Sequence, residues 1–110
     1  MSVSISTAAL SDQLGATQVI DVRRRPAFEA SAAMIPMAIW RDPAQVAVWH
    51  RELDRLRQVV VYCVHGHEVS QGCAAFLETA EFRVAYLEGG FAHWSEEGRP
   101  VQAKPAQEPS

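Results

Sequence analysis

Four consecutive apolar residues, Val59–Tyr62 (VVVY), place the strongest constraint on the fold. A strand with one face in water alternates apolar and polar side chains, and this segment does not alternate. Such a run is typical of a strand in a parallel sheet that is buried on both faces. The rest of the chain must therefore cover both faces of this strand. Cys63 follows directly at its carboxyl end.

The segments on either side of this strand alternate between expected strands and expected helices. Further strands are expected at Gln18–Val22, Met37–Ile39 and Phe82–Leu87. Helices are expected at Thr7–Leu14, Ala27–Ala32, from Pro43 to Leu56, after His67 and at Phe91–Glu97. This alternation predicts an α/β domain with a mainly parallel sheet. Sheets of this kind bind ligands beyond the carboxyl ends of their strands.

Two of the expected helices carry recognisable start signals. Ser6 is a good N-cap for the first helix. Asp42 is the expected N-cap of a second helix, and Pro43 suits the first helical position after it. After Pro43, apolar residues recur at spacings of three and four, at Val46, Trp49, Leu53 and Leu56. This spacing predicts one apolar helical face that extends to Leu56.

The composition excludes several classes of protein. A chain of 110 residues is about the size of one domain, and we expect that domain at 1–101 with a flexible tail at 102–110. The formal charge of −3 argues against a nucleic-acid partner. No apolar run approaches the roughly 18 residues of a membrane span. Two cysteines and no signal-like start lead us to expect a reduced, cytoplasmic protein.

Cys63 lies where a parallel sheet concentrates its chemistry. The loop Cys63–Glu68 (CVHGHE) joins the buried strand to a helix, and Gly66 permits a tight turn. Backbone amides at such a turn bind anions and favour the thiolate form of a cysteine. A small buried core residue is the alternative for Cys63. Cys73 lies on the apolar stripe of the following helix, and there core packing is favoured.

His65 and His67 flank Gly66 in this loop. They are candidates for acid–base chemistry or for metal binding. The spacing of Cys63 and the two histidines is poor for zinc, and no fourth ligand lies nearby in the sequence. We therefore expect no metal, and histidines that only tune the electrostatic field of the loop.

Three motifs in order resemble the single-domain rhodaneses, a family of sulfurtransferases. They are Val19–Arg23 (VIDVR), Cys63–Glu68 (CVHGHE), and Leu87–Trp94 (LEGGFAHW) followed by Gly98–Val101 (GRPV). The resemblance extends from about Ser4 to Val101. It implies a rhodanese-like α/β fold, in which a mainly parallel five-stranded sheet is flanked by helices on both faces.

The resemblance also implies a reaction without a cofactor. The Cys63 thiolate would attack the outer sulfur of thiosulfate or of a persulfide donor and become a persulfide. A thiophilic acceptor such as cyanide or a thiol, including a protein thiol, would then remove that sulfur. The cradle for the transferred sulfur would be formed by the amides of Val64, His65, Gly66, His67, Glu68 and Val69. A protein-to-protein sulfur carrier and a non-catalytic binding module remain alternatives.

The sequence departs from its relatives at several positions. Phosphatases of the same fold carry an arginine in this loop, and none lies between Cys63 and Gln71. Glu68 takes a position where many thiosulfate-using relatives have arginine, so it would either repel thiosulfate or simply complement the helix N-terminus. Met34 and Met37 replace a histidine and a glycine of the relatives, which favours a repacked connecting loop.

Three other features have expected roles outside the chemistry. Asp21 and Arg23 are expected to hold the end of the sheet together by hydrogen bonds, and Trp94 to anchor the last helix. Arg24 and Arg25 extend Arg23 into a small basic patch that is either a solvated face or an attraction for anionic donors.

Overall fold

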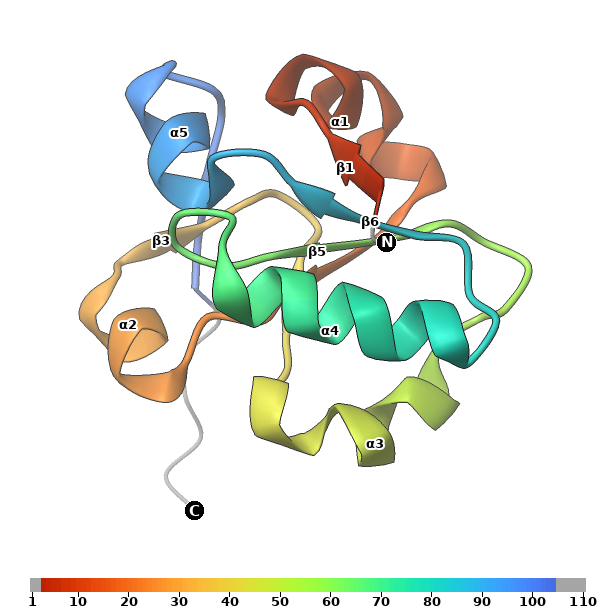
Figure 1. The fold of residues 1–110 in the computed structure, drawn as a ribbon. Coiled ribbons are helices and arrows are strands. Elements are labelled where there is room, and N and C mark those ends of the chain that lie inside the picture. The colour runs from red at the N-terminus through yellow and green to blue at the C-terminus, as the bar shows by residue number, and fades with distance from the viewer. Residues whose placement is uncertain (1–2, 105–110) are drawn as a thin grey trace.

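The computed structural model describes residues 3–104, which fold around one parallel sheet (Figure 1). The five strands lie in the order β1-β6-β5-β2-β4, and every neighbouring pair is parallel. Their bounds are β1 Val3–Ile5, β2 Gln18–Asp21, β4 Ile39–Trp40, β5 Val59–Tyr62 and β6 Val84–Leu87. This architecture confirms the α/β fold with a five-stranded parallel sheet.

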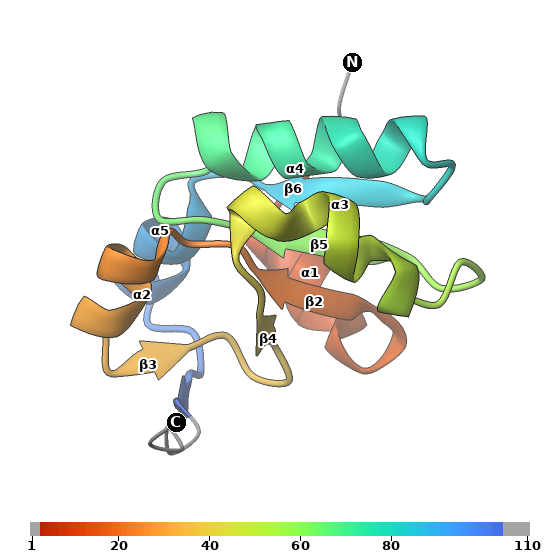
Figure 2. The ribbon, with the colours of Figure 1, turned by 90° about the horizontal axis from the view of Figure 1, so that it is seen from below.

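Helices cover both faces of this sheet. They are α1 Thr7–Gln13, α2 Arg25–Ala30, α3 Val46–Trp49, α4 Glu68–Thr79 and α5 Gly90–Glu96. Figure 1 shows α1 and α5 on one side of the sheet and α3 and α4 on the other, and Figure 2 shows α3 and α4 together from a second direction. Leu10, Phe28 and Trp94 bring α1, α2 and α5 into one core cluster. Trp49 and Leu77 bring α3 and α4 into the other.

Strand β5 lies at the centre of the sheet, and all four of its residues are fully buried. Val60 and Tyr62 point into the cluster with α1 and α5, whereas Val59 and Val61 point into the cluster with α3 and α4. The apolar run thus fills both cores, as the sequence predicts. Cys63 continues the alternation and faces the α3–α4 side.

A buried charged network closes the carboxyl end of β2. Arg23 donates from Nε and Nη2 to the Asp21 carboxylate at 3.0 and 2.7 Å, and both side chains are almost fully buried. The Tyr62 hydroxyl donates to Asp21 at 2.9 Å, while Arg23 also donates to the carbonyl of Ala33 at 3.0 Å. Burial, with the nearby Asp21 carboxylate, raises the pKa of Tyr62 above its ordinary value, so the phenol stays a neutral donor. The expected hydrogen-bonding role of Asp21 and Arg23 is confirmed.

The segment after Asp42 differs from the prediction. Asp42 does cap a helical start, since its carboxylate accepts from the amide of Ala44. The predicted continuous helix is instead a 3₁₀ turn at Pro43–Gln45, the short α3, and a second 3₁₀ turn at His50–Glu52. The prediction of one apolar face to Leu56 was wrong, because Leu56 is 87% exposed.

Long-range polar contacts explain why the helix stops. The Gln18 side chain accepts from the amide of Asp54 and donates to the carbonyls of Asp54 and Arg57. The Asp54 carboxylate also accepts from the amide of Leu56 and holds a turn. These contacts outweigh the apolar periodicity from which the helix was predicted.

The short strands were also predicted incompletely. Strand β1 was not predicted, and β4 begins at Ile39 rather than at Met37. A second, two-stranded antiparallel sheet pairs β3 (Ala33–Met34) with β7 (Gln102–Ala103). Gln102 and Ala103 therefore form a strand, although the sequence assigns them to the flexible tail. The rest of that predicted tail, 105–110, lies outside the described residues.

Two further expectations concern the last helix and membrane spans. Trp94 is fully buried and donates from Nε1 to the carbonyl of Pro100 at 2.9 Å, which confirms its role as an anchor.

Within residues 3–104, none of the helices combines the length and the apolar character needed to cross a bilayer.

The Asp21–Arg23 pair yields the first testable prediction. Asp21→Ala leaves the buried guanidinium without its counter-charge, and we expect the free energy of unfolding to fall by about 3–5 kcal/mol. Glu29→Ala, which breaks the half-exposed Arg25–Glu29 pair, is the control and should cost less than about 1 kcal/mol. Urea denaturation measures both values. Equal losses in the two variants would contradict the importance of the buried pair.

Candidate active site

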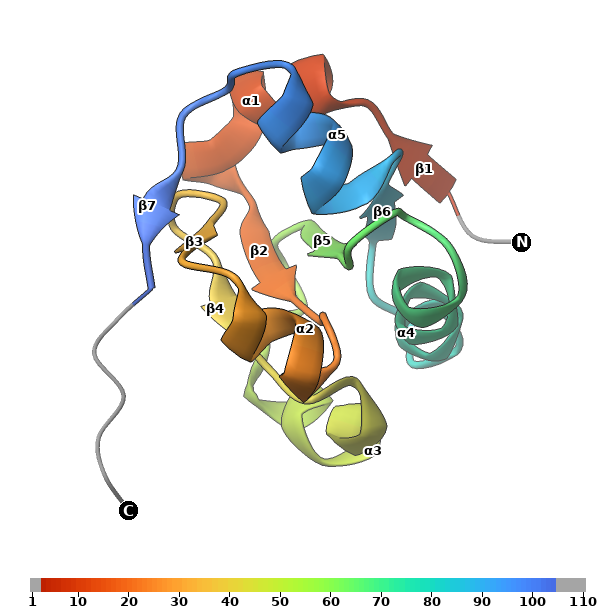
Figure 3. The same cartoon turned by 90° about the vertical axis from the view of Figure 1, so that its left-hand side faces the viewer.

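Cys63 lies between the end of β5 and the start of α4 at the carboxyl edge of the sheet. This loop is at the left of Figure 1 and turns toward the viewer in Figure 3. Cys63 is 6% exposed, so the thiol is sheltered without being sealed off. The side chains of Val64, His65, His67, Glu68 and Val69 surround the same cavity as Cys63, which brings the predicted loop residues together.

The Cys63 loop packs closely against the turn that leads into α5. Gly66 and Gly90 both have positive φ angles, of 74° and 63°. A Cβ atom on Gly66 would lie 2.6 Å from the carbonyl oxygen of Leu87, and one on Gly90 would lie 2.5 Å from the carbonyl oxygen of Cys63. No side chain fits at either position, so these glycines allow the two loops to touch.

This contact fixes the direction of the loop carbonyls. The amides of Phe91 and Ala92 donate to the carbonyls of Cys63 and Val64, both at 2.9 Å. Gln71 donates from its side chain to the carbonyl of Gly66 and from its backbone to that of His67, both at 3.0 Å. Four loop carbonyls are therefore held by α4 and α5.

The loop amides differ from the loop carbonyls. Within residues 3–104, none of the amides of residues 64–69 donates a hydrogen bond to another group. Unpaired amides in succession at a strand-to-helix turn form an anion-binding cradle, and the N-terminus of α4 adds partial positive charge. An anion at Cys63, whether a thiolate or a persulfide, would be stabilised by this arrangement.

Ser70 is a site residue that the sequence reasoning missed. It is fully buried in the first turn of α4, and its Oγ lies 3.2 Å from the Sγ of Cys63 as a hydrogen-bond partner. The thiol donates in this contact, and the hydroxyl can rotate to donate to a thiolate. A polar residue on the apolar stripe of this helix, which also holds Cys73 and Leu77, is the signal that could have found it.

The cavity around Cys63 has a volume of about 280 Å³ and contains three charged side chains. Arg23 is buried and paired with Asp21. Arg24 is exposed, and its side chain makes no ion pair or hydrogen bond with any residue of the described chain. Glu68 is exposed in the first turn of α4, where it both lines the cavity and complements the helix N-terminus.

The two cysteines differ in their surroundings. Cys73 is 4% exposed and packs in the α3–α4 core cluster, which confirms the predicted core position. Burial, and secondly the nearby Cys63, raises the pKa of Cys73 to about 12. Cys73 therefore stays a neutral thiol near pH 7 and is poorly suited to nucleophilic attack.

His65 and His67 are both exposed, with ring centroids 6.4 Å apart. In the part of the chain that the structure describes, no group of three or more His, Cys, Asp and Glu side chains could hold a metal ion.

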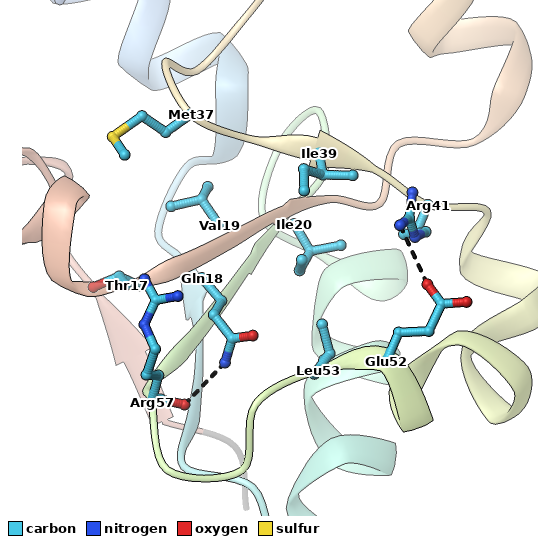
Figure 4. A pocket seen from close by; sticks show the side chains of 10 residues that line it. All are labelled: Thr17, Gln18, Val19, Ile20, Met37, Ile39, Arg41, Glu52, Leu53 and Arg57. Atoms are coloured by element: carbon cyan, nitrogen blue, oxygen red, sulfur yellow. Dashed lines mark hydrogen bonds and ion pairs between the residues drawn. The ribbon is translucent and has the colours of Figure 1, made fainter.

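A separate cavity of about 280 Å³ lies beneath the edge strand β4 (Figure 4). Its floor is apolar, and Arg41 forms an ion pair with Glu52 at its rim, at 3.3 Å. None of the described residues that line it is a cysteine or a histidine. Cys63 lines the other cavity and not this one.

Known proteins share this fold and parts of the sequence. A family model of the rhodanese-like domain matches residues 6–97. The solved structure of a rhodanese-related protein from Thermoplasma volcanium has a TM-score of 0.83 and 30% sequence identity, and the match covers 93% of this chain and 99% of that protein.

Two curated relatives carry functional names. A sulfurtransferase from Allochromatium vinosum is 32% identical over 100 residues, which cover 90% of this chain and 94% of the relative. The thiosulfate sulfurtransferase GlpE from Pseudomonas syringae is 38% identical over 77 residues, which cover 69% of this chain and 70% of the relative. The fold, the family model and these relatives agree, and the chain belongs to the rhodanese-like domain family.

Proposed function

We propose that this protein is a sulfurtransferase that carries a sulfane sulfur as a persulfide on Cys63. The observation that carries this proposal is a sheltered thiol beside the amides of residues 64–69, which donate no hydrogen bond to another group within residues 3–104. Such a cradle stabilises negative charge on the attacking sulfur and on the persulfide that follows. The names of the two curated relatives support the same chemistry.

The first half-reaction moves one sulfur atom onto the protein. The Cys63 thiolate attacks the outer sulfur of thiosulfate, a new S–S bond forms, and the bond between the outer sulfur and the sulfonate breaks. Sulfite leaves with the electron pair, and Cys63 holds a persulfide anion. No net oxidant is needed, because the sulfane sulfur keeps its oxidation state on transfer.

The second half-reaction restores the thiolate. An acceptor such as cyanide or a thiol attacks the outer sulfur of the persulfide, and the S–S bond to Cys63 breaks. In this step the Cys63 sulfur is the leaving group, and the Ser70 hydroxyl stabilises its negative charge. A covalent intermediate of this kind gives ping-pong kinetics.

Glu68 bears on the choice of donor. Its carboxylate lines the Cys63 cavity and has no partner among residues 3–104. A negative charge at the entrance opposes the approach of dianionic thiosulfate. Thiosulfate is therefore a poor donor for this chain in our account, and a thiol-borne persulfide is the better one.

The proposal is tested by the mass of the intact protein after incubation with a sulfur donor. Unsubstituted protein and Cys73→Ser should each gain one sulfur atom, while Cys63→Ser should gain none. Cyanide should then remove the added sulfur and produce thiocyanate. If Cys63→Ser gains sulfur as readily as the unsubstituted protein, Cys63 is not the acceptor site.

Ser70 provides a second prediction. Ser70→Ala removes a hydrogen bond to a charged sulfur, an interaction worth about 1.5–3 kcal/mol. We expect the kcat of sulfur transfer to fall by about one to two orders of magnitude, while Cys63 remains the labelled residue. Ser95→Ala, on the exposed side of α5, is the matched control. An unchanged kcat in Ser70→Ala would show that the hydroxyl does not act on the sulfur.

Glu68 provides a third prediction. Glu68→Gln removes an exposed negative charge from the cavity entrance, and an effect of about 1 kcal/mol lowers the KM for thiosulfate about fivefold. Glu96→Gln, exposed on α5, controls for the change in net charge. Steady-state kinetics at low ionic strength measure both variants. The same KM in Glu68→Gln as in the unsubstituted protein would remove Glu68 from the choice of donor.

A further inference from the structure

A second cavity adjoins the Cys63 cavity. It has a volume of about 540 Å³ and lies between the Pro43–Gln45 turn with α3 on one side and α4 on the other. Arg24 and Val69 line both cavities, so the two spaces meet at these side chains. The other residues that line the second cavity are Arg25, Asp42, Pro43, Ala44, Val46, Gly72, Cys73 and Phe76.

Gly72 is the unexpected member of this lining. It lies inside α4, where glycine weakens a helix relative to alanine. Neither its φ angle nor its packing requires glycine, because a Cβ atom there would meet nothing within 4 Å. In this it differs from Gly66 and Gly90. Glycine at this position leaves open space beside α4 where α4 lines the second cavity.

The charges at the junction favour an anionic ligand. The Arg24 guanidinium has no partner within residues 3–104, whereas Arg25 lies 3.7 Å from Glu29 and stacks over Trp40. The carboxylate of Asp42 accepts a hydrogen bond from the amide of Ala44 and so stabilises the start of the Pro43–Gln45 turn. The remaining lining is largely apolar, from Val46, Val69 and Phe76. Among the described residues, the cavity thus offers one cation without a partner, Arg24, next to an apolar wall.

We propose that the second cavity holds the body of a low-molecular-weight organic persulfide whose carboxylate pairs with Arg24. This inference rests on the proposed function and names its donor class. The sulfane end would reach Cys63 through the junction, while the organic part lies against Val46 and Phe76. A volume of about 540 Å³ is within the range of small-molecule sites, roughly 300–1,000 Å³, and exceeds what thiosulfate needs.

The transfer step is balanced for such a donor. The Cys63 thiolate attacks the outer sulfur of the persulfide R–S–SH, and the S–S bond of the donor breaks. The proton stays on the transferred sulfur, so Cys63 becomes a persulfide, and the donor leaves as the thiolate R–S⁻. The positive charge of Arg24 stabilises the negative charge that develops on the leaving sulfur.

The test uses two substitutions that place a phenylalanine side chain in the second cavity. Gly72→Phe fills it from α4, and Ala44→Phe fills it from the Pro43–Gln45 turn on the opposite side. If one variant does not fold, the other still tests the proposal. Ala75→Phe, exposed on α4 and outside both cavities, is the matched control. Measuring the intact mass of the protein over time gives the second-order rate constant of sulfur addition to Cys63. The donors are glutathione persulfide and thiosulfate.

The ratio of the two rate constants decides the outcome. We expect the ratio of glutathione persulfide to thiosulfate to fall at least tenfold in both filling variants and to stay within twofold in Ala75→Phe. An unaltered ratio in the filling variants overturns the second-cavity inference and leaves the sulfurtransferase proposal standing. Sulfur addition from neither donor in the unsubstituted protein overturns both.

The carboxylate pairing has its own test. Arg24→Gln should lower the rate constant for glutathione persulfide about fivefold, as the loss of an exposed charge pair predicts. The persulfide of glutathione diethyl ester has no carboxylate, and its rate constant should be the same in Arg24→Gln and in unsubstituted protein. Equal losses for acid and ester would show that Arg24 does not bind the carboxylate.

Discussion

The buried contact between Asp21 and Arg23 holds the functional edge of this protein together. One carboxylate at the end of β2 accepts hydrogen bonds from Arg23 and from Tyr62 of β5, and Arg23 in turn holds the carbonyl of Ala33. The Arg23 guanidinium also lies 4.6 Å from the ring centroid of Phe91 in α5. A charge buried this deeply is tolerated only when it is fully partnered. The network therefore fixes β2, β5 and α5 relative to one another, next to the loop that begins at Cys63.

The chemistry of the Cys63 loop depends on the hydrogen bonds that its carbonyl groups accept. Amides of α5 donate hydrogen bonds to the carbonyls of Cys63 and Val64. Gln71 donates to those of Gly66 and His67. Each bond directs a carbonyl oxygen toward a partner outside the loop, and the amides of residues 64–69 are left without a partner in the described part of the chain. Unpaired donors that surround a sulfur atom lower the free energy of its anionic forms. Gly66 and Gly90 are necessary because a side chain at either position would prevent the loops from meeting.

Much of the fold could be predicted because the strongest pattern, Val59–Tyr62, reports burial on two faces at once. The position of Cys63 followed from the rule that places ligands at the carboxyl ends of parallel strands. The end of the helix expected from Pro43 to Leu56 could not be predicted. Gln18, which is distant in the chain, holds the backbone of Asp54 in a non-helical conformation. Ser70 was missed for a similar reason, and Arg24 was predicted only as part of a small basic patch. Their significance lies in contacts across elements, with a sulfur atom and between two cavities, that local spacing does not reveal.

The central claim is that Cys63 carries the sulfur between two separate half-reactions. The most direct measurement isolates sulfur-loaded protein, free of donor, and then adds cyanide. We predict about one equivalent of thiocyanate per chain, with the protein returned to its original mass and ready to be loaded again. Absence of thiocyanate until fresh donor is added would contradict it, because sulfur would then pass from donor to acceptor without resting on Cys63.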